Sequence, residues 1–499
     1  MVKILDCTIR DGGYYNDWDF DNDIVDLYLS YIQKLPIDVI EIGYISRSID
    51  EYAGKYFYLN KNIITEVRKK CKMKIAVMID LKSISNHDEI DQLTNDLENI
   101  VDIIRLATNF SDIEKAKEIS VHLKQKGFDV CINLMKFSDI KIDDVFISKV
   151  SDIDKYTDIL YIVDSYGSIL PHKLKDLIRS IKKVSKVKTG FHGHNNLELA
   201  LANTIIAIEN GVDIVDATIT GMGRGAGNLK LELLLVYLNS LDNHNTFMFN
   251  ELSTIVERFN QLQNKYKWGT NLPYMISGAF SLPQKRVMDL IRLDRYSFDS
   301  IIKQIGIKEN KKFPIYKPKF KAENTILIGG GKSILDHKLA INSFIDKAKN
   351  FTVIHCTSKY VDIIKNNNSK ILFATSGDET MKINKLKNIS DYILAPNPRK
   401  LDPQLGPNIN FKELSEIEYI NNYTDSSLAI GLQIAIELKA INIYLVGFDG
   451  YKNVTSSKES ILQKETQEII SQFTKSRKLT SLTNTLYENI LTKSIYDQH

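Results

Sequence analysis

The sequence predicts an α/β protein with an N-terminal (β/α)8 barrel, a helical extension and a second, Rossmann-like α/β domain. From residue 2 to about residue 238, eight short runs rich in Val and Ile alternate with helical stretches. These runs are continuously apolar, which is typical of parallel strands that are buried on both faces. A second α/β pattern, with a glycine-rich first turn, opens at residue 325.

Eight strand–helix units in succession favour a closed barrel over an open, doubly wound sheet. Helical periodicity between the strands is clearest at residues 112–126, 171–184 and 197–210. The predicted barrel strands are residues 3–7, 38–43, 73–79, 102–107, 128–134, 158–163, 188–192 and 213–218.

Three segments are expected along the chain: the barrel at residues 1–240, a helical extension and linker at 241–321, and the Rossmann-like domain at 322–499. We expect the tail at residues 487–496 to be helical. The predicted elements of the last domain are strands at 325–328, 352–356, 371–374, 392–395 and 441–446, and a helix at 426–438.

The composition excludes several classes of function. The 499 residues carry 65 basic and 62 acidic side chains, so the small net charge of +3 predicts no nucleic-acid or membrane-surface partner. No apolar run is long enough to cross a bilayer, and there is no secretory signal. The four cysteines lack a paired metal-ligand spacing. We therefore expect a cytoplasmic protein with buried free thiols. We also expect a homo-oligomer.

Polar residues fall at the carboxyl ends of the predicted barrel strands, where barrels build their active sites. His192 and His194 alternate on one strand, so their imidazoles point the same way. Asp11 can add an oxygen ligand from a distant part of the chain. Two imidazoles and a carboxylate with open positions predict a catalytic divalent-metal site. The other polar residues at this end are Arg10, Glu41, Arg105, Asn133 and Asp164.

Three motifs resemble the signatures of the HMG-CoA-lyase-like superfamily of metal-dependent barrels: residues 5–13 (LDCTIRDGG), 192–196 (HGHNN) and 221–228 (GMGRGAGN). The match spans nearly all of residues 1–240, and residues 190–228 most resemble the 4-hydroxy-2-oxovalerate aldolases. The resemblance implies that Asp11, His192 and His194 bind the metal. It also implies that Asn228 approaches or joins it. Mn²⁺ or Mg²⁺ would suit this site, and Co²⁺ or Zn²⁺ would also be accepted.

The resemblance further implies that Arg10 stabilises a metal-bound enolate. The chain position of Glu41 suits it to orient Arg10, and that of Asp6 suits it to support the metal ligands. The sequence departs from the aldolase pattern at Tyr14, where the aldolases carry a histidine that acts as general base. A phenol is a weak base at neutral pH. Either the base lies elsewhere, or Tyr14 acts through a relay, or the substrate differs.

Some of the polar residues at the strand ends can contact the substrate. Arg105, Asn133 and Asp164 are candidates for binding the substrate. Arg105 and Asp164 can equally form ion pairs inside the barrel.

The glycine turn of the second domain, residues 329–333 (GGGKS), matches neither the spacing of a P-loop nor the dinucleotide fingerprint. Residues 326–334 and 443–450 resemble Rossmann-like domains related to bacterial sialyltransferases, which are linked to surface-glycan synthesis. This resemblance implies a nucleotide or nucleotide-sugar pocket formed by Gly329, Gly331, Ser333 and Asp449. The alternative is a domain that serves assembly only.

The expected function is that of a carbon–carbon lyase, a metal-dependent aldolase that forms the enolate of pyruvate or another 2-oxo acid. The enolate would add to an aldehyde, or the reverse reaction would release one. The aldehyde would be sugar-derived, with a role in polysaccharide biosynthesis, or would pass to a partner enzyme. One alternative is a Claisen-type synthase that joins an acyl-CoA and a 2-oxo acid. Another is a glycosyltransferase-like nucleotide-binding protein with the barrel as scaffold.

Overall fold

The computed structural model describes residues 2–49, 52–241, 249–293, 296–305, 311–347, 351–364, 370–376, 389–399, 409–452 and 457–497. The chain divides into two units, Met1–Val287 and Met288–His499. Helices α10 (Phe249–Tyr266) and α11 (Leu272–Ala279) of the expected extension belong to the first unit, and α13 (Phe298–Ile305) belongs to the second. Among the described residues, no helix is both long enough and apolar enough to span a membrane.

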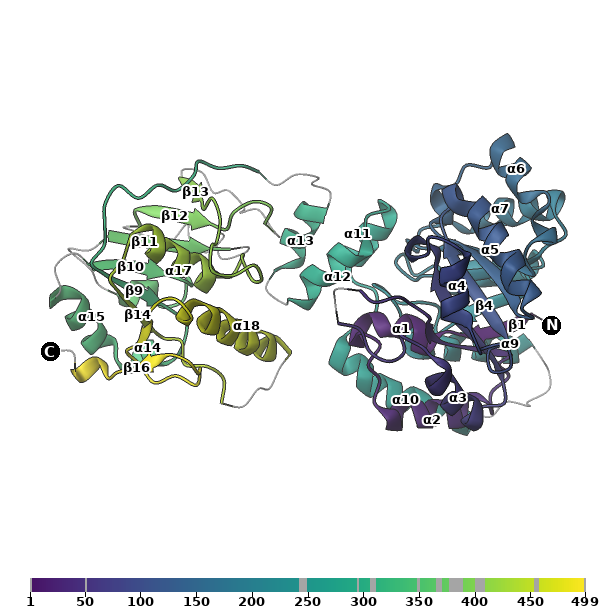
Figure 1. The fold of residues 1–499 in the computed structure, drawn as a ribbon, viewed down its shortest axis with the longest axis horizontal. Coiled ribbons are helices and arrows are strands. Elements are labelled where there is room, and N and C mark those ends of the chain that lie inside the picture. Colours follow the sequence, from purple (N-terminus) through teal and green to yellow (C-terminus); the bar gives the residue numbers. More distant parts are fainter. Residues whose placement is uncertain are drawn as a thin grey trace. The chain divides into compact units, whose positions relative to one another are not determined.

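The first unit is a closed barrel of eight parallel strands in chain order, which confirms the predicted fold class (Figure 1). Strand β1 closes the barrel by pairing with both β2 and β8, so that Leu5 lies opposite Val39 on one side and Asp216 on the other. The strands are β1 (Lys3–Asp6), β2 (Val39–Tyr44), β3 (Lys74–Asp80), β4 (Ile103–Thr108), β5 (Asp129–Leu134), β6 (Ile159–Asp164), β7 (Lys188–Gly193) and β8 (Ile214–Ala217).

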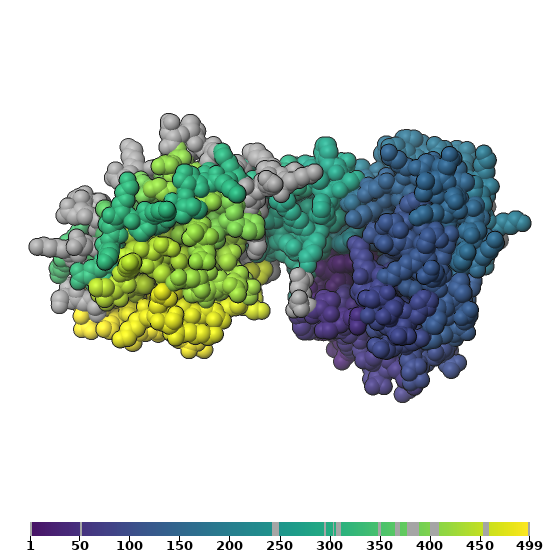
Figure 2. Space-filling view, turned by 45° about the horizontal axis from the view of Figure 1, so that its top comes forward, coloured from purple at the N-terminus to yellow at the C-terminus, as the bar shows by residue number. Residues whose placement is uncertain are grey.

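Amphipathic helices cover the outside of the barrel. Helix α7 (Pro171–Val184) is typical: it begins with a proline in its first turn and buries Leu174, Ile178 and Ile181. Their spacing places them on one face, toward the strands. In Figure 2 the visible surface of this unit is formed largely by segments coloured purple to blue, which belong to its N-terminal part. The barrel interior is apolar below the strand ends, with Leu5, Cys131 and Tyr161 in one buried cluster.

The second unit contains a parallel sheet in the order β13-β12-β11-β10-β9-β14-β15-β16. The chain runs outward from β9 to one edge and then returns beside β9 as β14, so the strand order reverses between these two strands, as in Rossmann-like sheets. Helices α17 (Ser427–Glu437) and α18 (Ser457–Thr474) pack against each other. The strands are β9 (Asn324–Ile328), β10 (Phe351–His355), β11 (Lys370–Thr375), β12 (Asp391–Leu394), β13 (Phe411–Glu413), β14 (Asn442–Val446), β15 (Thr480–Ser481) and β16 (Leu491–Thr492).

The expectation of a helical tail at residues 487–496 was wrong. The structure places β16 there, followed by a 3-10 turn at Ile495–Asp497. Leu491 pairs with Thr480 of β15, so this segment completes the sheet edge. Cys7, Cys71, Cys131 and Cys356 are buried and free, as predicted.

Candidate metal centre and active site

Asp11, His192 and His194 converge at the carboxyl end of the barrel. Asp11 lies in the first turn of α1 (Thr8–Asn16), directly after β1, while the two histidines lie at the end of β7 and just beyond it. Asp11 Oδ2 is 3.7 Å from His192 Nε2 and 3.9 Å from His194 Nε2. All three side chains are buried. One oxygen and two nitrogens therefore surround a space of the size that one ion requires.

Hydrogen bonds to the other ring nitrogens orient both imidazoles. His192 Nδ1 donates to Asp216 Oδ2 (2.9 Å), and His194 Nδ1 donates to the backbone oxygen of Asp164 (2.9 Å). A backbone oxygen only accepts, so Nδ1 of His194 carries the proton and the lone pair of Nε2 faces Asp11. Burial, together with the charges of His192 and Arg224, lowers the pKa of His194 to about 3. His194 is therefore neutral at pH 7, as a metal ligand must be.

Asn228 and the negative charge of Asp11 also suit this cluster to a cation. Burial alone would raise the pKa of Asp11, but Arg10, His192 and His194 lower it below its usual value, so Asp11 is a carboxylate. Asn228 donates from Nδ2 to Asp11 Oδ2, and its own Oδ1 is buried without a hydrogen-bond partner. An unpartnered buried oxygen beside a carboxylate and two imidazole lone pairs suits a divalent cation.

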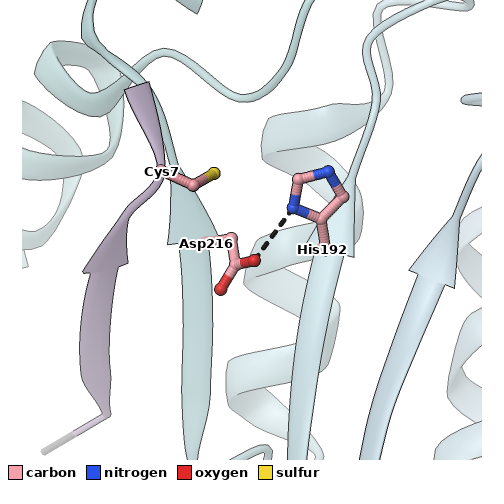
Figure 3. Close-up of side chains that lie close together, drawn as sticks. All are labelled: Cys7, His192 and Asp216. Atoms are coloured by element: carbon pink, nitrogen blue, oxygen red, sulfur yellow. Dashed lines mark hydrogen bonds and ion pairs between the residues drawn. The ribbon is translucent and has the colours of Figure 1, made fainter. Parts of the chain in front are cut away.

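A second cluster, Cys7, His192 and Asp216, shares one histidine with the first (Figure 3). It fits a metal less well because its groups are already paired. Asp216 accepts from His192 and from Arg105, and the Cys7 thiol lies 3.7 Å from the backbone oxygen of Ala217. Burial raises the pKa of Cys7 well above its usual value, so the sulfur keeps its proton. We therefore treat the cluster with Asp11 as the metal centre.

A chain of buried ion pairs supports the metal centre. Arg10 Nε donates to Glu41 Oε2 (2.7 Å), and a second nitrogen of Arg10 pairs with Asp11. Arg105 bridges Glu41 Oε2 (2.8 Å) and Asp216 Oδ2 (2.6 Å). Asp216 in turn orients His192. Glu41 therefore accepts a hydrogen bond directly from Arg10, as its predicted role of orienting Arg10 requires.

Arg105 belongs to this network and is fully buried. Two of its nitrogens bond carboxylates, and its guanidinium carbon lies 4.2 Å from the ring centre of Tyr161. This geometry is that of the interior ion pair, one of the two interpretations that the sequence allowed. We propose that Arg105 positions Glu41 and Asp216 and does not contact the substrate.

Asp164 and Asn133 occupy different positions around the site. The Asp164 carboxylate accepts from the backbone amides of Ser168 and Ile169 (3.1 Å each), and burial raises its pKa to about 6. Its side chain therefore holds the loop after β6, while its carbonyl orients His194. Asn133 shares the interior face of β5 with Cys131, and its Oδ1 is buried without a partner. It remains a proposed substrate contact.

Tyr14 lies one turn after Asp11 on α1. Its hydroxyl is 3.3 Å from that of Tyr44 at the end of β2, and its ring packs edge to face with that of Trp18, with the ring centres 4.8 Å apart. Burial, with the neighbouring Tyr14, raises the pKa of Tyr44 well above its usual value. The two phenols therefore form a hydrogen-bonded pair at the rim of the site.

The glycine-rich loop after β8 depends on glycine at position 227. Gly227 has φ +81°, and a Cβ there would lie 2.1 Å from the backbone oxygen of Gly221. Asn228 N donates to that same oxygen (3.0 Å), so the close approach of the two backbones sets the position of Asn228. Trp268 holds the loop from outside, because its Nε1 donates to Thr220 O (3.0 Å).

Sequence reasoning did not single out Asp216 or Arg224. Asp216 is the one charged residue within the apolar strand β8, which was an available signal. Arg224 is the only side chain of the 221–228 loop that carries a charge. Asp6, which the sequence suggested as a support for the metal ligands, instead bonds Thr8 and Tyr28, and burial raises its pKa to about 6.

The four residues proposed for nucleotide binding come together in the second unit, where the strand order reverses. Gly331 N donates to Gly447 O (2.7 Å), so the loops after β9 and β14 touch. Ser333 N, at the start of α14 (Ser333–Asp336), donates to Asp449 Oδ2 (2.9 Å), and a Cβ at Gly331 would meet the same carboxylate. The amide that would bind a phosphate thus already bonds an internal carboxylate, so a phosphate there would have to displace Asp449.

The first unit is thus a closed (β/α)8 barrel, and two imidazoles and a carboxylate at the carboxyl ends of its strands form a candidate divalent-metal centre. A model of the HMGL-like family matches residues 1–258, and the chain belongs to this family. It is 27% identical to a 4-hydroxy-2-oxovalerate aldolase from Bacillus cereus over 248 residues, which cover 48% of this chain and 70% of the relative. It is 29% identical to an oxaloacetate decarboxylase from Mycobacterium tuberculosis over 236 residues (47% and 69% of the two chains).

Among solved structures, the N-terminal domain of an aldolase candidate from Bacteroides vulgatus is similar, with 45% identity and a TM-score of 0.56. The match covers 60% of this chain and 99% of that domain. The family and the fold therefore agree with the resemblance that the three motifs carry.

Proposed function

We propose that this protein is a divalent-metal-dependent lyase that makes or breaks a carbon–carbon bond next to the carbonyl of a 2-oxo acid such as pyruvate, with an aldehyde as the other reactant. The main support for this proposal is that Asp11, His192 and His194 converge beside the fixed guanidinium of Arg10. The aldolases among its relatives support the reaction class.

Asp11, His192 and His194, with Asn228 beside them, would hold the ion, and the ion would supply Lewis-acid polarisation of the 2-oxo acid carbonyl. Arg10 contributes a second positive charge. Glu41 and Asp11 hold its guanidinium, so it is in place before negative charge develops on the carbonyl oxygen. Preorganised charge-assisted hydrogen bonds of this kind stabilise a transition state more than a ground state.

Aldol cleavage also requires a group that takes the proton from the hydroxyl of the 4-hydroxy-2-oxo acid. We propose Tyr14 for this step, with Tyr44 as the next hydroxyl of a relay, because the two oxygens lie 3.3 Å apart. Tyr14 would accept the substrate proton as it passes its own proton to Tyr44, which would pass one to water, and the relay would run backward in the synthetic direction.

The relative named oxaloacetate decarboxylase, together with Tyr14, favours decarboxylation as a second candidate function. Loss of CO2 from a 2-oxo diacid leaves its bonding electron pair on the adjacent carbon, and a proton from water then completes pyruvate. This route removes no proton from carbon, so it does not need the histidine base whose position Tyr14 occupies. CO2 release from oxaloacetate would distinguish it from aldol chemistry.

Finer features are also proposals. Mn²⁺ or Mg²⁺ is the expected ion, and a sugar-derived aldehyde for surface-glycan synthesis is the proposed substrate. A sugar aldehyde that condenses with pyruvate would support the latter, and failure of a panel of such aldehydes would contradict it. Residues 322–499 remain the proposed nucleotide-sugar domain, which equilibrium binding of a nucleotide sugar would test.

The first test is exchange of the pyruvate methyl protons in D2O, measured by NMR with Mg²⁺. We expect metal-dependent exchange in the wild type and in His172→Ala, which changes an exposed histidine on α7. We expect none in His192→Ala or after chelation of the metal. Wild-type protein that binds metal but neither exchanges pyruvate nor decarboxylates oxaloacetate would contradict the proposed function.

A further inference from the structure

Arg224 is a cation at the metal centre that the roles assigned so far do not use. It lies in the glycine-rich loop between β8 and α9 (Leu231–Leu241) and is partly exposed. Its Nη2 donates to the backbone oxygen of Ser165 (3.1 Å), and its guanidinium carbon lies 5.8 Å from the ring centre of Tyr14. Its Nε is buried without a hydrogen-bond partner.

The segments that contact Arg224 are those that carry the metal ligands. Ser165 follows Asp164, whose backbone oxygen orients His194. Tyr14 lies one helical turn after Asp11. Asn228, four residues further along the loop, donates to the same Asp11. Its contacts with Ser165 and Tyr14 therefore hold the guanidinium of Arg224 beside the metal centre.

The ion pairing of Arg224 differs from that of the other two arginines at this end of the barrel. Arg10 and Arg105 each pair with two carboxylates. Within the described part of the chain, no carboxylate pairs with Arg224, whose hydrogen bond goes to an uncharged carbonyl. A half-buried guanidinium keeps its charge and presents a planar fork of donors that matches carboxylate and phosphate groups.

We propose that Arg224 binds an oxyanion of the substrate at the mouth of the barrel and so selects for substrates that carry a negative charge at that position. The oxyanion is either the carboxylate of the 2-oxo acid or an anionic group on the aldehyde, and both present the same chemistry to the guanidinium. The proposal rests on the proposed function for the identity of the substrates. The competing interpretation is structural, with Arg224 only tying the loop to Ser165 and Tyr14.

The test compares wild type with Arg224→Ala and Arg224→Lys, and with Arg179→Ala, which removes an exposed arginine from the outer helix α7. The first arm measures how methyl exchange depends on pyruvate concentration, without aldehyde. The second measures kcat/KM for glyceraldehyde 3-phosphate and for glyceraldehyde at saturating pyruvate. The third measures equilibrium binding of pyruvate and of glyceraldehyde 3-phosphate by tryptophan fluorescence. Trp18 packs on Tyr14 and Trp268 bonds the loop, so both tryptophans of the chain report on this site.

Loss of a charge-assisted bidentate contact should weaken binding of the anion about 10- to 100-fold in Arg224→Ala and less in Arg224→Lys. The kcat for exchange and the metal affinity should stay near the wild-type values. A higher KM and Kd for pyruvate assign Arg224 to the carboxylate of the 2-oxo acid. Loss of the preference for the phosphorylated aldehyde, with pyruvate unaffected, assigns it to the aldehyde. Either result supports the proposal.

Unchanged binding of both anions would overturn the proposal, as would a fall in Tm with a matching loss of metal affinity, which the structural role predicts. The binding arm also separates this proposal from the proposed function. Wild-type protein that neither exchanges pyruvate nor decarboxylates oxaloacetate contradicts the lyase reaction, whereas pyruvate binding that depends on Arg224 still supports the oxyanion site.

Discussion

Replacing Asp216 with asparagine tests whether the buried ion pairs set the properties of the metal centre. Asp216 Oδ2 accepts from Arg105 Nη2 at 2.6 Å and from His192 Nδ1 at 2.9 Å, while Oδ1 is buried without a partner. Asparagine keeps the size of the side chain. With its oxygen in the place of Oδ2, it retains both hydrogen bonds but loses the charge and buries an unpartnered amide.

The expected magnitudes follow from these contacts. The hydrogen bond from His192 becomes neutral and the one from Arg105 loses its ionised acceptor, at about 1 kcal/mol each, and the buried amide costs about 1–3 kcal/mol. The free energy of unfolding of the barrel should therefore fall by about 3–5 kcal/mol, toward the lower value because Arg105 keeps its bond to Glu41. Imidazole basicity also falls, so affinity for Mn²⁺ should drop about 10- to 100-fold.

Urea unfolding followed by tryptophan fluorescence measures the first quantity, because Trp18 and Trp268 both lie in the barrel unit. Mn²⁺ affinity comes from titration of free Mn²⁺ by EPR on folded protein. The matched control is Asp176→Asn on the exposed side of α7, which should change neither quantity. Folded Asp216→Asn that binds Mn²⁺ as tightly as wild type would refute the role of Asp216 in orienting His192.

Three further predictions concern single contacts. Arg10→Lys keeps the charge but loses the planar guanidinium that bonds Glu41 and Asp11, so turnover should fall about 10²- to 10³-fold. A threefold or larger change in metal affinity would contradict the assignment of Arg10 to the transition state. Gly227→Ala meets the backbone oxygen of Gly221 and takes a residue with a Cβ to φ +81°, so barrel stability in urea should fall by more than about 2 kcal/mol. Burial lowers the pKa of His355 to about 4 from 6.5, so only the unfolded chain takes up its proton between these values. Stability of the second unit should fall by about 2–3 kcal/mol as pH drops from 6.5 to 4, and His355→Phe should flatten the dependence in melts followed by circular dichroism.

The barrel strands were predictable to within about one residue because each is a continuous apolar run bounded by helical periodicity. The cluster of Asp11, His192 and His194 was predictable as a pair of alternating histidines plus one distant aspartate. The edges of the second sheet were not. β13, β15 and β16 have two or three residues each, too few for a periodicity to show. Their pairing is decided by neighbouring strands that lie far away in the sequence.

The partners of Arg105 show a further limit. They come from β2 and β8, which are not adjacent to β4 in the barrel, so only the side chains that cross the interior bring them together. The sequence could therefore place Arg105 at a strand end but could not choose between an ion pair and a substrate contact. The same holds for Arg224, whose loop carries no periodicity and whose contacts lie on α1 and after β6.

The charge balance of the site connects the metal centre with Arg224. The ion-paired network contains three carboxylates, Asp11, Glu41 and Asp216, and two guanidiniums, Arg10 and Arg105, so it carries a net charge of −1 with neutral histidines. A divalent cation brings this to +1, which one carboxylate of a 2-oxo acid neutralises. Arg224 adds one more positive charge at the rim, outside this network, where a second negative charge on the substrates would pair with it. Buried charges are stable when they are paired, so this balance favours a dianionic substrate pair over pyruvate with a neutral aldehyde.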